Sequence, residues 1–177
     1  MTSEGDRQAL LRIAREAVVA AANGRDAAAV RPSGALADPA AVFVTLYARG
    51  ELRGCIGRLE ADWAVAAAVV HCAVSAARAD PRFPAVTAAE LSRISIELSI
   101  LGPLEQLASI DEIEVGRHGL LVEHGRRRGL LLPQVAVEWR WEREAFLDQT
   151  CDKAGLPRDA WRHGARIWRF EAEVFGE

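Results

Sequence analysis

The sequence has almost no lysine. Of its 22 basic residues only Lys153 is a lysine, and the formal net charge is −3. A chain with this charge balance has no broad electrostatic attraction to nucleic acid or to anionic lipid. The preference for arginine, with an alanine-rich first third, indicates a bacterial genome of high GC content.

Long apolar runs are also missing. The most apolar segment, 63–77, is interrupted by His71 and is shorter than the ~20 residues that a bilayer requires. The N-terminal segment begins acidic and lacks the basic stretch and apolar core of a signal peptide. We therefore expect a cytoplasmic protein without a membrane segment.

Paired cysteines and cofactor motifs are absent as well. The three cysteines, Cys55, Cys72 and Cys151, are far apart and form no CxxC pair, which excludes a zinc knuckle or a disulfide framework. The sequence contains no GxGxxG, Walker A or HExxH motif, and its four histidines lack paired metal-ligand spacing. We expect reduced thiols, no metal and no cofactor. Cys72 and Cys151 are expected to be packing residues.

What is present predicts one α+β domain over residues 1–177, with a mostly antiparallel sheet flanked by helices. Apolar periodicity predicts helices over 10–21, 63–78 and 142–154, and strands over 41–47, 51–59, 93–101, 120–123, 129–132 and 165–175. Asp62 is expected to cap the second helix, and Pro133 to begin a short one. Residues 25–40 are expected to be a loop with one helical turn over 26–30. His71, on the second predicted helix, is expected to be a core histidine.

The segment Leu52-Arg53-Gly54-Cys55-Ile56-Gly57 is the most unusual in the chain. In a regular strand Leu52 and Ile56 face the core, and Arg53, Cys55 and Gly57 share the opposite face.

Two interpretations of this segment stay open. In one, Cys55 is a reactive thiol in the positive field of Arg53, and Gly54 and Gly57 leave room for a substrate. In the other, Cys55 is a small buried residue at a β-bulge.

Four further residues are candidates for a site. Glu97 lies on the polar face of its strand, as a general base or in an ion pair with Arg53. His118 is an acid, base or ligand, or a solvated loop histidine. Arg82 either clamps an anion or ties down its loop with Asp80. Gln134 either caps the start of a helix or binds a ligand. The basic turn 126–128 is expected to be a solvated hairpin tip.

Six segments in the right order resemble the AMMECR family, named for a chromosomal-region gene product linked to Alport syndrome, midface hypoplasia and elliptocytosis. Its prokaryotic members are called AmmeMemoRadiSam system protein A. The resemblance covers the chain from about residue 10. The segments are FVTLYARGELRGCIG (43–57), DPRFPAV (80–86), ELSRISIELSILGPLE (90–105), 116–120, GLLLPQVAVEW (129–139) and FLDQTCDKAGL (146–156).

The resemblance implies a fold with a larger and a smaller lobe and a cleft between them. It implies no established activity. LRGCIG is the family's proposed functional motif, and the implied partners are a Memo-like protein and a radical S-adenosylmethionine protein.

Two hypotheses of function follow, and both leave the oligomeric state open. In the first, the protein modifies or binds a small molecule in the interlobe cleft. In the second, it is a non-catalytic binding or adaptor module for those partners. The first hypothesis assigns catalytic roles to Cys55, Glu97 and His118, and substrate-binding roles to Arg53, Gly54, Gly57, Arg82 and Gln134.

Overall fold

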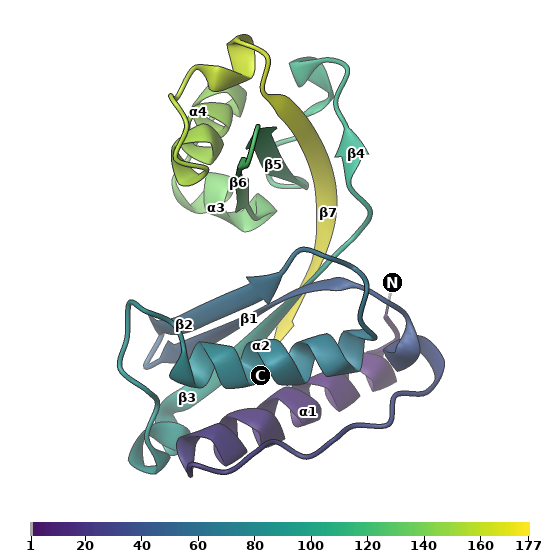
Figure 1. Cartoon of the computed structure of the whole chain (residues 1–177), viewed down its shortest axis with the longest axis vertical. Coiled ribbons are helices and arrows are strands. Elements are labelled where there is room, and N and C mark those ends of the chain that lie inside the picture. Colours follow the sequence, from purple (N-terminus) through teal and green to yellow (C-terminus); the bar gives the residue numbers. More distant parts are fainter. Residues whose placement is uncertain (1) are drawn as a thin grey trace. The chain divides into compact units, whose positions relative to one another are not determined.

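The computed structural model describes residues 2–177 and divides the chain into two compact units (Figure 1). Unit 1 comprises Met1–Ile100 and Glu173–Glu177, and unit 2 comprises Leu101–Ala172. The last strand of the chain contributes residues to both units. The α+β class and the antiparallel sheet predicted from the sequence are confirmed.

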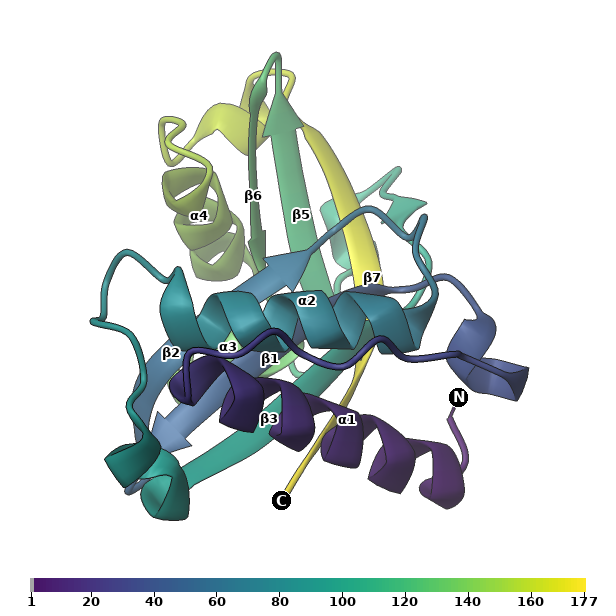
Figure 2. The ribbon, with the colours of Figure 1, turned by 60° about the horizontal axis from the view of Figure 1, so that its bottom comes forward.

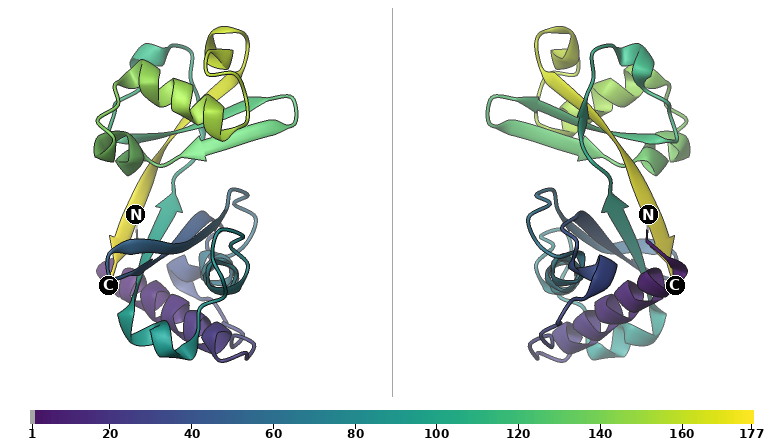
Figure 3. Two further views of the ribbon diagram at one scale, coloured as in Figure 1. Left: turned by 90° about the vertical axis from the view of Figure 1, so that its left-hand side faces the viewer. Right: turned by 90° about the vertical axis from the view of Figure 1, so that its right-hand side faces the viewer.

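Unit 1 is a sheet covered on one face by two helices. Strands β1 (Ala41–Ala48) and β2 (Glu51–Arg58) form a hairpin, and β3 (Ile94–Leu101) lies on the other side of β1. Helices α1 (Glu4–Ala22) and α2 (Val65–Arg78) lie beside each other against the same side of these strands (Figures 2 and 3). The sequence predicts these five elements, but α1 begins at Glu4 and not at the predicted residue 10.

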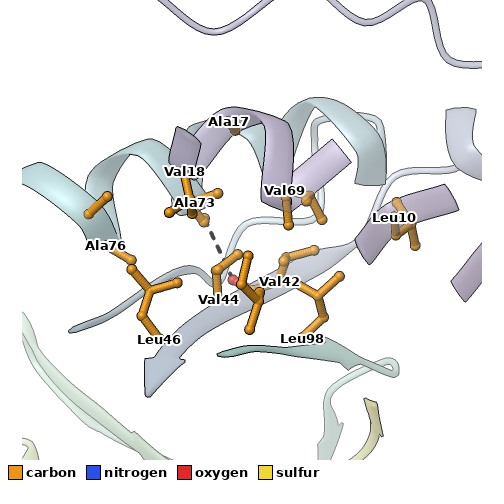
Figure 4. Packing of buried hydrophobic residues seen from close by; sticks show 14 of the residues in the cluster. Leu10, Ala17, Val18, Val42, Val44, Leu46, Val69, Ala73, Ala76 and Leu98 are labelled. Atoms are coloured by element: carbon orange, nitrogen blue, oxygen red, sulfur yellow. Dashed lines mark hydrogen bonds between the residues drawn. The ribbon is translucent and has the colours of Figure 1, made fainter. Parts of the chain in front are cut away.

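The core of unit 1 fills the space between the sheet and the helices (Figure 4). Alternate strand residues point into it because successive side chains of a strand face opposite sides. Burying each large apolar side chain stabilises the fold by about 1.5–3 kcal/mol. The labelled core residues are Leu10, Ala17 and Val18 of α1, Val69, Ala73 and Ala76 of α2, and Val42, Val44, Leu46 and Leu98 of the strands.

Three local expectations in unit 1 are wrong. Helix α2 begins at Val65 without a side-chain cap, because its N-cap residue is Ala64 and Asp62, two residues earlier, binds the guanidinium of Arg58. His71 is exposed and lies edge-on to Trp63, with ring centroids 5.3 Å apart. The turn between α1 and β1 is a 3-10 helix at Gly34–Ala37, not a turn at 26–30.

Unit 2 has its own core, and its strands continue the sheet in the order β2-β1-β3-β7-β5-β6. Strand β5 (His118–His124) pairs with β6 (Arg127–Leu131) on one side and with β7 (Arg166–Gly176) on the other, and β4 (Glu105–Gln106) pairs with β7. Helices α3 (Pro133–Glu138) and α4 (Arg143–Lys153) pack against β5 and β6. Pro133 occupies the first turn of α3, as the sequence predicts. The buried residues include Leu120, Val122, Phe146, Leu147 and Cys151.

Three further 3-10 helices, Ala88–Arg93, Ile110–Glu112 and Ala160–Arg162, complete the described chain. Within residues 2–177, none of the helices has the length and apolarity needed to cross a bilayer.

Candidate functional site

The orientation of Cys55 is set by an irregularity in the β1–β2 hairpin. Ala48 pairs with Glu51 across the turn, but the partner of Leu46 is Gly54 and the partner of Tyr47 is Leu52. Arg53 is therefore an extra residue in β2, a β-bulge. As a consequence Leu52 turns away from the core and is 41% exposed, which corrects the regular alternation expected for this segment.

Beyond the bulge the strand follows the expected alternation. Gly54 and Ile56 lie on the side of the helices, and Cys55 and Gly57 lie on the opposite side. We call this opposite side of the β1–β2–β3 sheet the outer face. Cys55 is half-buried there.

The bulge directs Arg53 to the loop that follows α2. Its Nε donates to Oε1 of Glu90 at 2.8 Å, and its Nη1 donates to the carbonyl oxygen of Pro84 at 2.9 Å. Glu90 also accepts from the backbone nitrogen of Thr87, which completes the capping box that the sequence predicts. The hydrogen bond from Arg53 lowers the pKa of Glu90 to about 2. Arg53 thus ties the loop to β2, which disfavours the expected role in binding an anionic substrate.

The backbone of Cys55 is held by an ion pair between Asp80 and Arg82. Its N–H donates to Oδ2 of Asp80 at 2.9 Å, and its carbonyl oxygen accepts from Nη2 of Arg82 at 3.3 Å. Arg82 binds both carboxylate oxygens of Asp80, through Nε at 2.9 Å and Nη2 at 2.7 Å.

The two members of this pair differ in exposure. The side chain of Asp80 is 2% exposed and that of Arg82 is 50% exposed. The hydrogen bond from Arg82 holds the pKa of the Asp80 carboxyl well below its usual range. Of the two roles considered for Arg82, the geometry supports the one in which it holds its loop in place together with Asp80. The pair satisfies the outward backbone groups of Cys55, which belong to the free edge of the sheet.

Thr45 is the side-chain partner of the Cys55 thiol. The two residues are directly opposite each other in the hairpin, and the Thr45 hydroxyl donates to Sγ of Cys55 at 3.3 Å. Thr45 is buried, with 6% of its surface exposed. This places the thiol of the half-buried Cys55 and a fixed hydroxyl side by side on the outer face.

The two glycines of the motif are required by packing. A Cβ at Gly54 would lie 2.3 Å from the carbonyl oxygen of Ala76 in α2, and a Cβ at Gly57 would lie 2.2 Å from the ring of Phe43. The space beside each glycine is thus filled by the protein, which corrects the expectation that it is left for a substrate.

Glu97 lies on β3 and therefore two strands away from β2. The expected neighbourhood of Glu97 and Arg53 is wrong, because β1 lies between their strands and Arg53 binds Glu90. Glu97 accepts a hydrogen bond from the Tyr47 hydroxyl at 3.4 Å, so it lies on the outer face with Thr45.

The last two predicted site residues belong to unit 2. His118 is not a loop residue but the first residue of β5. It is buried, and its Nδ1 accepts from the backbone nitrogen of Glu114 at 3.0 Å. Gln134 lies in the first turn of α3, and its buried Oε1 has no hydrogen-bond partner among residues 2–177. The other predicted site residues, Arg53, Gly54, Cys55, Gly57, Arg82 and Glu97, all belong to unit 1.

Burial distinguishes the other two cysteines from Cys55. It raises the pKa of the Cys72 thiol to about 11 and also raises the pKa of Cys151. Both thiols are buried in apolar clusters, which confirms that they are packing residues. All three cysteines are free.

An open depression of about 640 Å³ lies in unit 2 around the first turn of α4. It is lined by Ile110, Asp111, Arg140, Trp141, Glu142, Arg143, Glu144 and Ala145. The sequence-predicted site residues are not in this lining. Among the described residues, no group of three or more His, Cys, Asp or Glu side chains is placed to hold a metal ion.

Comparison with known proteins identifies the family. The family model described as AMMECR1 matches residues 11–175. This chain belongs to the AMMECR1 family.

Its relatives in the family are similar over most of their length. A protein from Methanosarcina mazei is 40% identical over 187 aligned residues, which cover 100% of this chain and 94% of the relative. A protein from Thermofilum pendens is 46% identical over 159 residues, which cover 80% and 75% of the two chains. Both organisms are archaea, and a bacterial source stays a prediction from composition.

A solved structure supports the fold assignment. The crystal structure of an uncharacterized protein from Pyrococcus horikoshii is similar to this chain with a TM-score of 0.88 and 39% sequence identity, and covers 95% of this chain and 89% of that one. The family resemblance recognised in the sequence is therefore confirmed.

Sequence reasoning missed Thr45 and the hydrogen-bonding role of Asp80 at Cys55. Thr45 is the single aliphatic hydroxyl residue in the run 41–47, and that is its only signal in the sequence. A regular two-residue hairpin would place Thr45 opposite Gly54, and only the bulge brings it opposite Cys55.

Proposed function

We propose that this protein binds and modifies a small molecule on the outer face of unit 1, where Cys55 contacts the ligand. The observation that carries the proposal is the fixed pair of Cys55 and Thr45, with Sγ and Oγ1 3.3 Å apart. The backbone N–H of Cys55 is held by Asp80 and its carbonyl oxygen by Arg82, so the thiol is positioned before a ligand arrives.

The proposal includes the partners that the family resemblance implies. A Memo-like protein and a radical S-adenosylmethionine protein would supply or consume the small molecule. The free state of all three cysteines supports a reducing, cytoplasmic location.

Alkylation kinetics test the role of the thiol. With iodoacetamide at pH 8, Cys55 of the folded protein should react at least about ten-fold faster than Cys72 and Cys151, because only Cys55 is half-exposed and the other two are buried with raised pKa values. Mass spectrometry of peptides gives the three rates separately. Equal rates at Cys55 and Cys72 contradict the proposal.

Metabolite retention tests the ligand. The protein is incubated with a cell extract, alone and with the two partner proteins, and the bound and altered small molecules are identified by mass spectrometry. Cys55→Ser should lose a compound that the wild type retains or changes, while Cys151→Ser, a buried thiol outside the site, should keep it.

A second candidate function, a non-catalytic adaptor, is favoured by a specific observation. The charged side chains around Cys55 bind one another and the backbone, whereas Sγ receives its hydrogen bond from a neutral hydroxyl. A nucleophilic thiol is usually activated by an adjacent base. If Cys55→Ser binds both partner proteins as the wild type does and changes no metabolite, the adaptor function is the correct one.

A further inference from the structure

An exposed apolar patch lies on unit 2 around the end of α3. Its members are Val115, Val137 and Trp139, which are 40%, 56% and 67% exposed. A Cβ at Gly116 would lie 3.2 Å from Cγ2 of Val137, so the turn that carries Val115 approaches α3 and the patch is continuous. Contiguous apolar patches on a protein surface mark sites of interaction, and tryptophan is enriched at the centres of interfaces.

The open depression of unit 2 adjoins this patch. The ring of Trp139 stacks on that of Trp141, with centroids 6.0 Å apart and ring planes 16° apart. Trp141 and Arg140 belong to the lining of the depression, whose volume is about 640 Å³. A hollow of this size holds a drug-sized molecule, and it therefore has room for one indole side chain. The same surface thus presents an exposed ring and, beside it, a hollow that can receive one.

The depression carries two charges that are not paired within the chain. The side chains of Arg140 and Glu142 form no hydrogen bond or ion pair with any other residue of the described chain, 2–177. They have opposite signs and flank Trp141 in the sequence. The other charged residues of the lining are held in ion pairs, Asp111 with Arg143 at 2.7 Å and Glu144 with Arg162 at 2.8 Å.

The backbone of Arg140 is strained. Its φ of 55° lies in the left-handed region, which glycine adopts without a steric penalty and other residues do not. Strained residues of this kind concentrate at functional sites. The strain at Arg140 is therefore an indication of function that is independent of the exposed tryptophan.

We propose that this surface of unit 2 is an interface with a second copy of the chain, related to the first by a two-fold axis. Such an interface uses the same patch twice, so the patch must be complementary to itself. Trp139 of each copy enters the depression of the other copy beside Trp141, and Arg140 of each copy binds Glu142 of the other.

The shape and the charge of the surface both favour this occupant. The exposed ring lies next to the hollow, and the unpaired cation lies next to the unpaired anion. Because these two charges cancel, the patch has no preference for a strongly acidic or strongly basic partner, whereas a second copy satisfies both charges at once. The inference concerns unit 2 and does not depend on the role of Cys55.

Charge reversal tests the pairing on the full chain. We expect a weak dimer, with a dissociation constant on the order of tens of micromolar, because the patch is small. Sedimentation velocity should therefore show wild-type monomer at about 1 µM and mostly dimer at about 300 µM. Arg140→Glu and Glu142→Arg should each weaken association at least about tenfold, because the two-fold axis places two like-charge contacts in every dimer.

An equimolar mixture of these two variants is the decisive measurement. Arg140→Glu makes both positions acidic and Glu142→Arg makes both basic, so each contact across a mixed dimer joins opposite charges. The mixture should form a 1:1 dimer with nearly the wild-type affinity, which native mass spectrometry identifies by mass. Arg12→Glu, an exposed substitution in α1, is the matched control for charge reversal and should dimerise as the wild type does.

Two further variants test the ring and the strain. Trp139→Ala should weaken association at least about tenfold and leave the circular dichroism spectrum unchanged, because the side chain is 67% exposed. Arg140→Gly relieves the backbone strain and should nevertheless weaken association, since it removes the cation. A wild type that stays monomeric at about 300 µM overturns the proposal. A dimer that persists in both single reversals, a mixture that stays monomeric, or an equal effect of Arg12→Glu overturns it as well.

Discussion

Asp80 connects the loop after α2 to the strand that carries Cys55. It is buried, accepts a hydrogen bond from the backbone of Cys55, and forms the ion pair with Arg82. Removing the charge from such a group leaves polar donors without a full partner. The position of the thiol therefore depends on a residue 25 positions away in the sequence.

We predict that Asp80→Asn lowers the free energy of unfolding by about 2–3 kcal/mol, since it removes the charge of a buried carboxylate that accepts hydrogen bonds from Arg82 and from the backbone of Cys55. Asp62→Asn is the matched control. It breaks the exposed Arg58–Asp62 pair, and the expected loss is less than about 1 kcal/mol. Urea unfolding followed by circular dichroism measures both. Equal losses in the two variants would contradict the assignment.

The lowered pKa values of Asp80 and Glu90 predict how the free energy of unfolding depends on pH. The folded pKa values of Asp80 and Glu90 lie below those of the unfolded chain, which are about 4. Their contribution to stability is complete above pH ~4–5 and is lost as the pH falls toward the folded values, which for Glu90 is about 2. Wild-type stability should decrease over this window, and less steeply in Asp80→Asn and in Glu90→Gln. Urea midpoints measured from pH 7 to pH 2 provide the test.

Gly54 lies where β2 packs closely against α2. We predict that Gly54→Ala lowers the free energy of unfolding by about 2–3 kcal/mol or prevents folding, because the new methyl group would meet the backbone carbonyl of Ala76. Gly57→Ala should cost less, since the ring of Phe43 is a side chain and can turn. Gly5→Ala in α1, where the nearest atom is 3.8 Å away, should be neutral or stabilising. Thermal unfolding of the three variants ranks them, and a stable Gly54→Ala protein would contradict the close packing.

At the scale of elements, helix α3 ends in a strained conformation. Arg140 has a positive φ of 55°, and the backbone nitrogens of Arg140 and Trp141 donate to the carbonyl oxygens of Val137 and Ala136. These bonds form a helix-ending motif in which the strained position is usually glycine. The α3 terminus thus carries an arginine where the backbone favours glycine.

We predict that Arg140→Gly raises the free energy of unfolding by about 1 kcal/mol, because glycine adopts this conformation without a steric penalty. Arg12→Gly, at an exposed position inside α1, should instead lower it by about 1 kcal/mol. Differential scanning calorimetry of both variants checks the opposite signs. A lowered melting temperature for Arg140→Gly would show that its side chain contributes more than the strain costs.

At the scale of the whole molecule, the C-terminal end of β7 completes unit 1. Glu173 binds Arg7 and the N-terminal segment through Thr2, and Glu177 binds Arg15 and the backbone nitrogen of Ile96. The chain leaves unit 1 after β3 and returns to it only with residues 173–177. Unit 1 is therefore complete only when residues 173–177 have been made.

We predict that deletion of residues 173–177 lowers the stability of unit 1 by about 2–4 kcal/mol, because it removes these ion pairs and the contact of Phe175 with the core. Hydrogen exchange should accelerate in α1 and β3, while β5 and α4, whose core consists of unit 2 residues, change less. Unchanged exchange in α1 and β3 would contradict the prediction. Glu171→Gln, an exposed substitution just before the deleted segment, is the control and should have little effect.

The sequence by itself determined the elements and the family. Alternation in 93–101, the two strands around Arg49-Gly50, the capping box of Thr87 and Glu90, and the order of the six family segments all correspond to what is observed. These features are local, because hydrophobic periodicity and turn chemistry depend on residues close together in the chain.

Only the tertiary structure decided which residues surround Cys55. The Arg49-Gly50 turn fixes Ala48 opposite Glu51, and in a regular hairpin this register would place Arg53 opposite the buried Leu46. The bulge avoids that burial and puts Gly54 opposite Leu46, where a side chain would meet the backbone of Ala76 in α2. A shift of one residue in the register moves every following side chain to the other face of the sheet. Whether such a bulge forms depends on packing between segments that are distant in the sequence. For this reason the partners Thr45 and Asp80, and the separation of Glu97 from Arg53, follow from the fold and not from the sequence pattern.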